Sequence, residues 1–199
     1  MTADNTHDGA SLADAAAAVR EGHAVVYPTE TVYGLGADAT DADAVQRVFD
    51  LKDRPRDNPL SLGVPSVDAA LEHTRPTALE ERFMRRFLPG PVTVVVERRS
   101  TLPDVLTAGR DRVGVRVPDH EIALDLLARG PPLTATSANR SGSPSVTRVA
   151  DLDDRIRDGA AVVVDGGETP GTESTVVDPG RGVIHRRGAM ADAIEAWLS

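Results

Sequence analysis

Cysteine is absent from this chain of 199 residues, which excludes disulfides, thiolate nucleophiles and cysteine-bound zinc together. Aromatic residues make up only 3% of the sequence, so the core must rest on valine, leucine, isoleucine and alanine. No apolar run approaches the roughly 18 residues that a membrane-spanning helix needs. The first residues are polar and acidic, unlike a secretory signal. We therefore expect a cytoplasmic protein.

Lysine is almost missing as well, because Lys52 is the only one and arginine supplies the other basic side chains. With 22 basic and 31 acidic residues, the formal net charge is −9. An acidic, lysine-poor surface resembles that of proteins from salt-loving organisms, in which carboxylates keep the surface hydrated. Such a charge also repels the phosphates of nucleic acids, so tight nonspecific binding of RNA is not expected.

The order of apolar and polar segments is typical of one domain of mixed α/β class. Strands are predicted at 23–27, 60–64, 92–97, 113–117, 133–136, 160–164, 175–177 and 183–185. Helices are predicted at 11–21, 41–51, 77–88, 121–129, 148–157 and 189–198. Because these elements intermix without strict βαβ alternation, we expect a single twisted, mixed β-sheet with flanking helices. Residues 1–10 are expected to be a flexible N-terminus, and residues 11–199 the folded domain.

The first polar segment after a predicted strand is Y-P-T-E-T-V-Y-G-L-G at 27–36. Its threonines offer hydroxyls, Glu30 offers a carboxylate, and Gly34 and Gly36 allow close approach of the backbone to a ligand. The spacing Gly34-x-Gly36-x-x-Ala39 imitates a dinucleotide-binding fingerprint. The glycines do not lead from a strand directly into a helix, however, which argues against that interpretation. Taken alone, the segment is equally compatible with a structural turn.

Basic side chains gather at Lys52, Arg54 and Arg56, at the end of a predicted helix. Cations are favourable at a helix C-terminus for structural reasons alone. The only lysine lies here, however, and a compact ammonium suits a phosphate or carboxylate, so we favour a ligand-binding role. Arg112 and Arg116 are four residues apart on a predicted strand and share one face, where either an anion or solvent could meet them.

Hydroxyl and amide side chains follow another predicted strand directly. The segment S-A-N-R-S-G-S-P-S begins with Ser137 and contains Asn139, and Thr147 lies just beyond it. Hydroxyls, an amide and a flexible backbone suit a cradle for a carboxylate or a phosphate, although an ordinary Ser/Gly loop is the alternative. The segment G-T-E-S-T-V-V-D at 171–178 indicates little on its own.

Several common catalytic arrangements are missing from the sequence. The five histidines show no metal-ligand spacing. Lys52 is not preceded by the glycines of a P-loop, and a G-x-S-x-G elbow is absent. The candidates that remain describe a cationic, hydroxyl-rich site without a protein nucleophile. Such a site should bind a polyanion and let its substrates react with each other.

Taken in order, these segments resemble the motifs of the YrdC-like threonylcarbamoyl-AMP synthases. The segment at 27–36 resembles the opening motif of that family, and Lys52-x-Arg54 with Ser137-x-Asn139 resembles its signature tetrad. The segments S-A-N-R-S-G-x-P-S, E-S-T-V-V-D and R-R-G follow in the family's order, so that the resemblance runs from about residue 11 to residue 198. It implies a single catalytic domain whose sheet surrounds a deep, positively charged cavity.

The resemblance also implies a reaction, in which L-threonine, bicarbonate or CO2, and ATP give threonylcarbamoyl-AMP and pyrophosphate. Mg2+ would accompany ATP without a dedicated protein site. The product would pass to a transferase complex that modifies an adenosine of tRNA, with only weak contact between this chain and tRNA and none with a membrane.

Site residues are implied position by position. The catalytic tetrad would be Lys52, Arg54, Ser137 and Asn139. The threonine-binding residues would be Thr31, Arg116, Ser137 and Ser174. The ATP-binding residues would be Lys52, Arg54, Asn58, Arg112, Asn139, Thr147 and Arg186. Gly63 stands where many relatives place a histidine near the threonine, and this departure concerns that one contact.

Two other functions remain open. A basic cavity would also suit a module that binds double-stranded RNA or tRNA without adenylate synthesis. The net charge and the scarcity of aromatic side chains for base stacking argue against it. The second is a domain of the same fold that forms a carbamoyl adenylate from another substrate, such as carbamoyl phosphate. The small polar side chains at Thr31 and Ser174 argue only weakly against that.

Overall fold

The computed structural model describes residues 9–199, so residues 1–8 of the expected N-terminal segment lie outside the described residues. One sheet contains the strands β1 (Ala24–Tyr27), β2 (Gly34–Gly36), β3 (Ser61–Gly63), β4 (Val92–Glu97), β5 (Arg112–Arg116), β6 (Leu133–Ser137), β7 (Ala160–Val163), β8 (Thr175–Asp178) and β9 (Val183–Arg186). Their order in the sheet is β7-β1-β2-β6-β3-β5-β4-β8-β9. Parallel pairing in β1–β7, β3–β5 and β4–β8 occurs beside antiparallel pairing elsewhere, which confirms the expected mixed sheet.

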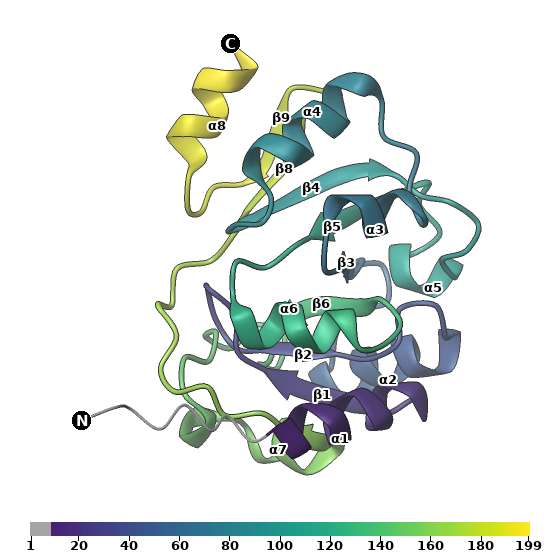
Figure 1. Ribbon diagram of the computed structural model, residues 1–199, viewed down its shortest axis with the longest axis vertical. Helices are drawn as coiled ribbons and strands as arrows, with labels where there is room; N and C mark the ends of the chain where they lie inside the picture. The colour runs from purple at the N-terminus through teal and green to yellow at the C-terminus, as the bar shows by residue number, and fades with distance from the viewer. Residues whose placement is uncertain (1–8) are drawn as a thin grey trace.

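Helices cover the sheet and both ends of the molecule (Figure 1). They are α1 (Gly9–Arg20), α2 (Ala42–Lys52), α3 (Val67–Leu71), α4 (Ala78–Phe87), α5 (Asp104–Thr107), α6 (Glu121–Ala128), the short 3-10 helix η1 (Val149–Asp151), α7 (Asp154–Gly159) and α8 (Ala191–Leu198). In Figure 1, α4 and α8 lie at one end of the molecule, and α1 and α7 at the other. Within residues 9–199, none of the helices has the length and apolarity needed to cross a membrane.

Helix α2 places the basic cluster, and its two ends are defined by local hydrogen bonds. The side chain of Asp41 accepts a hydrogen bond from the backbone of Asp43, which satisfies a free donor at the start of the helix. At the other end, Asp53 adopts the left-handed conformation with φ of 47°. Lys52 therefore lies on the buried face of the last turn, and the chain changes direction directly before Arg54.

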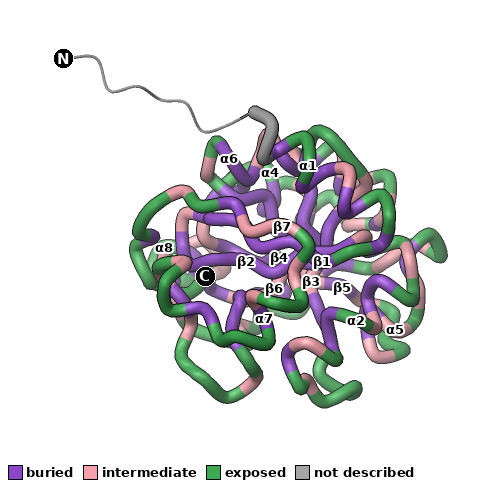
Figure 2. The backbone as a smooth tube through the Cα atoms, turned by 90° about the horizontal axis from the view of Figure 1, so that it is seen from below, coloured by how far each residue is buried: buried purple, intermediate pink, exposed green. Residues whose placement is uncertain are grey.

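The core has two parts because β1 is buried on both faces. Val25 and Tyr27 pack with apolar residues of α1 and α6, whereas Ala24 and Val26 belong to the larger cluster on the other face. Figure 2 shows the central strands as mostly buried, with exposed backbone concentrated in the surrounding helices and loops. One face of β4, β5 and β8 is left to line the site, together with the loops after β1 and α2.

The structure differs from the sequence predictions at the short helices α3 and α5, which were not expected, at β2, and at the helix predicted at 148–157. Strand β2 was not expected, because glycines give little strand propensity. Gly34 and Gly36 lie against the ring of Tyr27, where an added Cβ would come within 3.0 Å of ring atoms. The single helix predicted at 148–157 is instead split into η1 and α7, because Asp153 starts a new helix by accepting a hydrogen bond from the backbone of Arg155.

Candidate functional site

A cavity of about 800 Å³ opens among the loops after β1 and α2 and the strands β3, β4, β5, β6, β8 and β9. Most of the residues predicted for the site line it, namely Thr31, Arg54, Asn58, Arg112, Arg116, Ser137, Ser174 and Arg186. Gly63 also lies in its wall. The residues come from five separate segments of the sequence, and the strand order brings them together.

Three predicted residues, Lys52, Asn139 and Thr147, are not in the wall of the cavity. The carbonyl of Thr147 accepts a hydrogen bond from the backbone of Thr169 at 2.9 Å, which joins two loops behind the wall. Contacts of these three residues with a ligand stay predictions.

Lys52 is buried, and its ammonium contacts the end of β6 instead of open solvent. Its Nζ donates to the carbonyl of Ser137 and, at 2.5 Å, to the carbonyl of Asn139. Burial, and then the positive charge of Arg54, lowers the pKa of this amine from 10.5 to about 7. Lys52 thus joins α2 to β6, and the tetrad predicted from the sequence is assembled in space.

Asn139 shapes the loop that follows β6. Its amide nitrogen donates to the carbonyls of Arg140 at 2.9 Å and Ser143 at 2.7 Å, while its side-chain oxygen accepts a hydrogen bond from the hydroxyl of Ser137. Strand pairing of Ser137 with Gly34 fixes the strand end beside the loop after β1. The hydroxyl of Ser137 is therefore held at the cavity by a partner that lies behind it.

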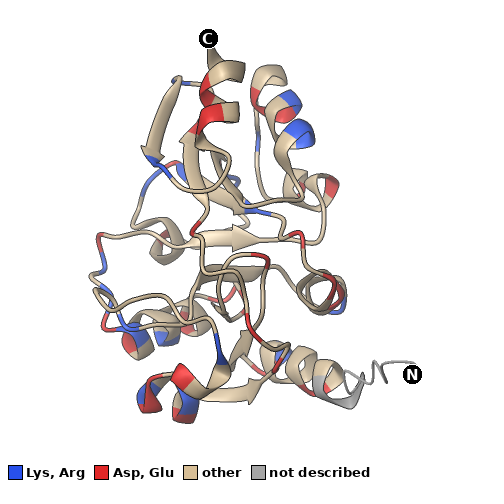
Figure 3. Cartoon of the chain, turned by 90° about the vertical axis from the view of Figure 1, so that its left-hand side faces the viewer, with Lys and Arg blue, Asp and Glu red and all other residues tan. Residues whose placement is uncertain are grey.

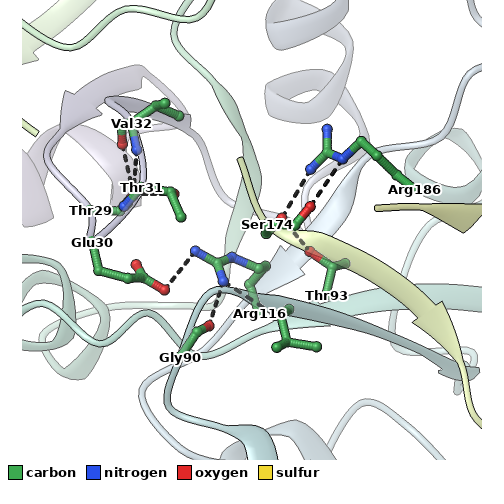
Figure 4. A network of polar contacts seen from close by, with 10 residues as sticks. Thr29, Glu30, Thr31, Val32, Gly90, Thr93, Arg116, Ser174 and Arg186 are labelled. Atoms are coloured by element: carbon green, nitrogen blue, oxygen red, sulfur yellow. Dashed lines mark hydrogen bonds and ion pairs between the residues drawn. The ribbon is translucent and has the colours of Figure 1, made fainter. Parts of the chain in front are cut away.

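Arg116 joins three segments of the wall (Figure 4). Its Nη1 donates to the carbonyls of Gly90 at 2.5 Å and Val92 at 3.2 Å, and its Nη2 pairs with Glu30 Oε1 at 2.9 Å. The second oxygen of Glu30, Oε2, is buried and has no hydrogen-bond partner among the described residues. A guanidinium that is fixed in this way presents its remaining edge in one orientation, which suits two-point binding of a carboxylate.

Ser174 and Arg186 form a second polar group, also drawn in Figure 4. Arg186 donates from Nε to the carbonyl of Ser174 at 3.1 Å and from Nη2 to its hydroxyl at 2.9 Å. The same hydroxyl lies 3.2 Å from the hydroxyl of Thr93 on β4. Arg186 also pairs with Glu173 at 3.2 Å. The β8–β9 hairpin thus places a cation directly over the hydroxyl of Ser174.

Arg112 is surrounded by carboxylates. Its Nη2 lies 2.6 Å from Glu80 and 2.9 Å from Asp178, whose side chains are only 2% and 1% exposed. Burial alone would raise the pKa of Glu80, but hydrogen bonds from the backbone of Thr77 and from Arg112 outweigh it and lower that pKa. Two buried carboxylates already hold Arg112, and it shares one of them, Asp178, with Arg181 Nε at 3.6 Å. Arg112 is therefore largely neutralised within the fold, and its ATP contact stays a prediction.

Arg54 has a different environment. Its Nε donates to the carbonyl of Asn58 and its Nη2 to that of Pro59, both at 2.9 Å. Burial, and then the positive charge of Arg186, lowers the pKa of Arg54 below its usual value. An arginine in contact with carbonyls, and repelled by another arginine, keeps its attraction for an anion.

Comparison with known proteins decides the family. Residues 17–188 match the model of the Sua5/YciO/YrdC family, which is described as "Telomere recombination". The threonylcarbamoyl-AMP synthase of Shigella flexneri is 36% identical over 191 residues, which cover 93% of this chain and 100% of that relative. This chain belongs to the Sua5/YciO/YrdC family.

A second relative of this Sua5/YciO/YrdC protein is the threonylcarbamoyl-AMP synthase of Pyrococcus abyssi, which is 46% identical over 168 residues. The match covers 82% of this chain but 49% of that relative, so the chain spans about half the relative's length. The solved structure of Pyrococcus abyssi Sua5 complexed with L-threonine has the same fold, with a TM-score of 0.85 and 43% identity over 89% of this chain and 54% of that one.

The site of this Sua5/YciO/YrdC protein contains residues that were not selected from the sequence. Tyr27, Thr93 and Arg110 all line the cavity. Burial raises the pKa of Tyr27 to about 12, so its hydroxyl keeps its proton at neutral pH. Thr93 did carry a signal, as the one hydroxyl in the apolar run V-T-V-V-V. Arg110 begins the basic segment R-D-R-V-G-V-R at 110–116, but its place in the wall depends on the α2–β3 loop, where it donates to the carbonyl of Asp57.

Proposed function

We propose that this chain forms threonylcarbamoyl-AMP and pyrophosphate from L-threonine, bicarbonate or CO2, and ATP. The observation that carries the proposal is the cavity, in which buried hydroxyls and arginines from five segments converge. Membership of a family whose relatives are named threonylcarbamoyl-AMP synthases supports it, as does the binding of L-threonine by the Pyrococcus abyssi structure.

The charges of the cavity suit this reaction. A threonine carboxylate, a carbamate and a triphosphate must come together, and two like charges about 4 Å apart repel by several kcal/mol at an intermediate effective dielectric. Arg116 is assigned to the carboxylate because it is fixed by Glu30 and by two carbonyls. Arg54 and Arg186 are assigned to the nucleotide. Thr31 and Ser174 offer hydroxyls to the amino acid.

No covalent intermediate with the protein is required. The amine of threonine loses a proton and adds to CO2, which gives a carbamate; from bicarbonate, water is also released. A carbamate oxygen then forms a bond to the α-phosphorus of ATP, and the bond to the β-phosphate oxygen breaks to release pyrophosphate. The protein contributes alignment of the two reactants and positive charge around the phosphates.

Mg2+ is proposed to enter with ATP, where it would neutralise part of the phosphate charge. Among the described residues, no group of three or more His, Cys, Asp or Glu side chains is arranged to hold a metal ion. The contribution that we propose for the chain itself is the positive charge of its arginines and the hydroxyls of its threonine and serine side chains.

The product is proposed to pass to a transferase complex that modifies tRNA, in the cytoplasm, where ATP and tRNA are both present. The acidic net charge of −9 supports only weak contact with tRNA itself. The alternative of an RNA-binding module receives no support from the names of the relatives. Titration with duplex RNA at increasing salt would favour it only if tight binding appeared.

The reaction is tested by supplying ATP, Mg2+ and bicarbonate with each amino acid in turn, and by measuring pyrophosphate and the adenylate. We expect turnover with L-threonine. The variant Arg116→Lys should raise the KM for threonine about tenfold or more and change the KM for ATP little, because lysine loses the two-point contact. Arg148→Lys is the control, since Arg148 is exposed and pairs with Glu168 outside the cavity. Equal changes in both KM values, or no adenylate from any amino acid, would contradict the proposal.

A further inference from the structure

The arginines of the cavity differ in whether a carboxylate already neutralises them. Six arginines line the wall. Those within 4 Å of a carboxylate are Arg112, Arg116, Arg181 and Arg186. In the part of the chain that the structure describes, Arg54 and Arg110 have no such partner. Arg54 and Arg110 are therefore the two arginines of the wall whose charge no carboxylate of the described residues offsets.

Both of these arginines are held by the same loop. Arg110 donates from Nη2 to the carbonyl of Asp57 at 3.1 Å, and Arg54 donates to the next two carbonyls along the chain, those of Asn58 and Pro59. Three consecutive carbonyls of one loop therefore hold both side chains. Carbonyl dipoles carry no net charge to neutralise either guanidinium, so both would attract a polyanion bound at this loop.

The exposure of Arg110 and Arg54 indicates which part of a nucleotide would lie beside them. Arg110 is exposed at the mouth of the cavity, whereas Arg54 is half-buried and Arg116 is buried. The terminal phosphates of a nucleoside triphosphate carry most of its charge, and they must leave towards solvent as pyrophosphate. The mouth, with its two unneutralised cations, matches both requirements.

We propose that Arg110 binds the β- and γ-phosphates of ATP together with Arg54, and that Arg112 belongs to the scaffold of the cavity. This inference rests on the proposed function for the identity of the nucleotide. The inference itself requires only that a pyrophosphate group binds at the loop formed by residues 57–59, whatever nucleotide carries it.

The test is equilibrium binding of ATP, pyrophosphate and AMP by calorimetry, without threonine or bicarbonate, at ionic strength of about 0.15 M. The variant Arg110→Gln should bind ATP and pyrophosphate about tenfold more weakly and bind AMP unchanged, because a charge-assisted contact is lost only at the terminal phosphates. The matched control is Arg20→Gln. Like Arg110, Arg20 is exposed and donates to a backbone carbonyl, that of Arg129 at 2.8 Å, but it lies outside the cavity wall. Both variants remove one positive charge, so they differ only in where that charge is lost.

Equal affinities of the Arg110→Gln and Arg20→Gln variants for ATP and pyrophosphate would overturn the inference. It would also be overturned if AMP binding fell as much as ATP binding, since that would indicate general damage to the cavity. Thermal unfolding of both variants should remain equal. If the native chain bound pyrophosphate through Arg110 yet formed no adenylate in the separate turnover assay, the proposed reaction would fail while the polyphosphate site stood.

Discussion

At the Lys52 side chain, burial disfavours the charged ammonium, whereas the two carbonyls that it contacts favour it. The ammonium donates to two backbone carbonyls and is 1% exposed, yet its pKa is lowered to about 7. It has no carboxylate within 4 Å among the described residues, and Arg54 adds repulsion. The folded state therefore binds the proton less tightly than the unfolded chain does.

This difference predicts a pH dependence of stability. Between about pH 7 and about pH 10.5 the unfolded chain binds more protons at Lys52, so stability rises with pH in that window and is lost as the pH falls towards 7. We expect the free energy of unfolding of the native chain, relative to that of Lys52→Met, to rise by about 2 kcal/mol from pH 7 to pH 9. Urea denaturation of both chains at several pH values measures the difference between their free energies of unfolding. Contributions from other titrating groups are the same in both chains and cancel in this difference. A difference that stays constant with pH would show that the pKa is not lowered.

The sequence indicated that Lys52 lies close to Ser137 and Asn139, but not which atoms it contacts. The solitary lysine marked Lys52, and the structure does bring it to Ser137 and Asn139. The sequence could not indicate that the ammonium meets backbone carbonyls behind the wall, because carbonyl positions depend on tertiary structure. The partners of Arg112 were equally hidden, since Glu80 and Asp178 are 32 and 66 residues away in the chain.

The turn after the β8–β9 hairpin packs directly against the backbone that precedes β8. Gly188 donates its backbone N–H to the hydroxyl of Thr175 at 2.9 Å. An added Cβ at Gly188 would lie 2.3 Å from the carbonyl oxygen of Glu173 and 2.7 Å from backbone atoms of Ser174. These neighbours are backbone, so they cannot move aside as a flexible side chain would.

We therefore expect Gly188→Ala to lower stability by about 1–3 kcal/mol, as overpacking does elsewhere. Because the strain falls on Ser174, the KM for threonine should rise more than the KM for ATP. Gly130→Ala is the control, since nothing lies within 4 Å of a Cβ at this exposed position. Thermal unfolding and steady-state kinetics of both variants provide the measurement. Native-like stability of Gly188→Ala would mean that the hairpin can shift freely.

Apolar runs were predictable from the sequence even where the strand is short, whereas short elements without such a run were not. The runs that became β4, β5 and β6 were recognised because their side chains are buried in the sheet. The short helices α3 and α5 and the glycine-containing strand β2 were missed, since short elements without a continuous apolar run depend on contacts from the rest of the chain. The site was recognised through its motifs, whereas its geometry follows from a strand order that no local pattern encodes.

Over the described part of the molecule, charged residues of both signs lie mainly outside the strands. Figure 3 shows acidic and basic residues mainly on helices and loops, while the strands carry few. The net charge of −9 makes the surface repel itself when little salt is present.

Salt should therefore stabilise the fold. Raising KCl from about 0.1 M to about 1 M shortens the Debye length from about 10 Å to about 3 Å, so we expect the Tm to rise by several degrees. The control replaces three exposed acids that form no ion pair in the described structure, in the variant Asp14→Asn/Asp119→Asn/Asp158→Asn. Its Tm should respond less to salt, because less repulsion remains to be screened. Differential scanning calorimetry of both chains decides, and an unchanged or falling Tm in the native chain would contradict the expectation.

Glycines allow close packing in and beside the cavity wall. Gly34 lies under the ring of Tyr27, Gly114 lies beside the side chains of Ser61 and Thr93, and Gly188 abuts the backbone of Glu173 and Ser174. At Gly34 and Gly114 the neighbours are side chains, whereas at Gly188 they are main chain that cannot swing aside. Steric exclusion is therefore strictest next to Ser174, and ordinary mutational drift can hardly alter the molecule at that point.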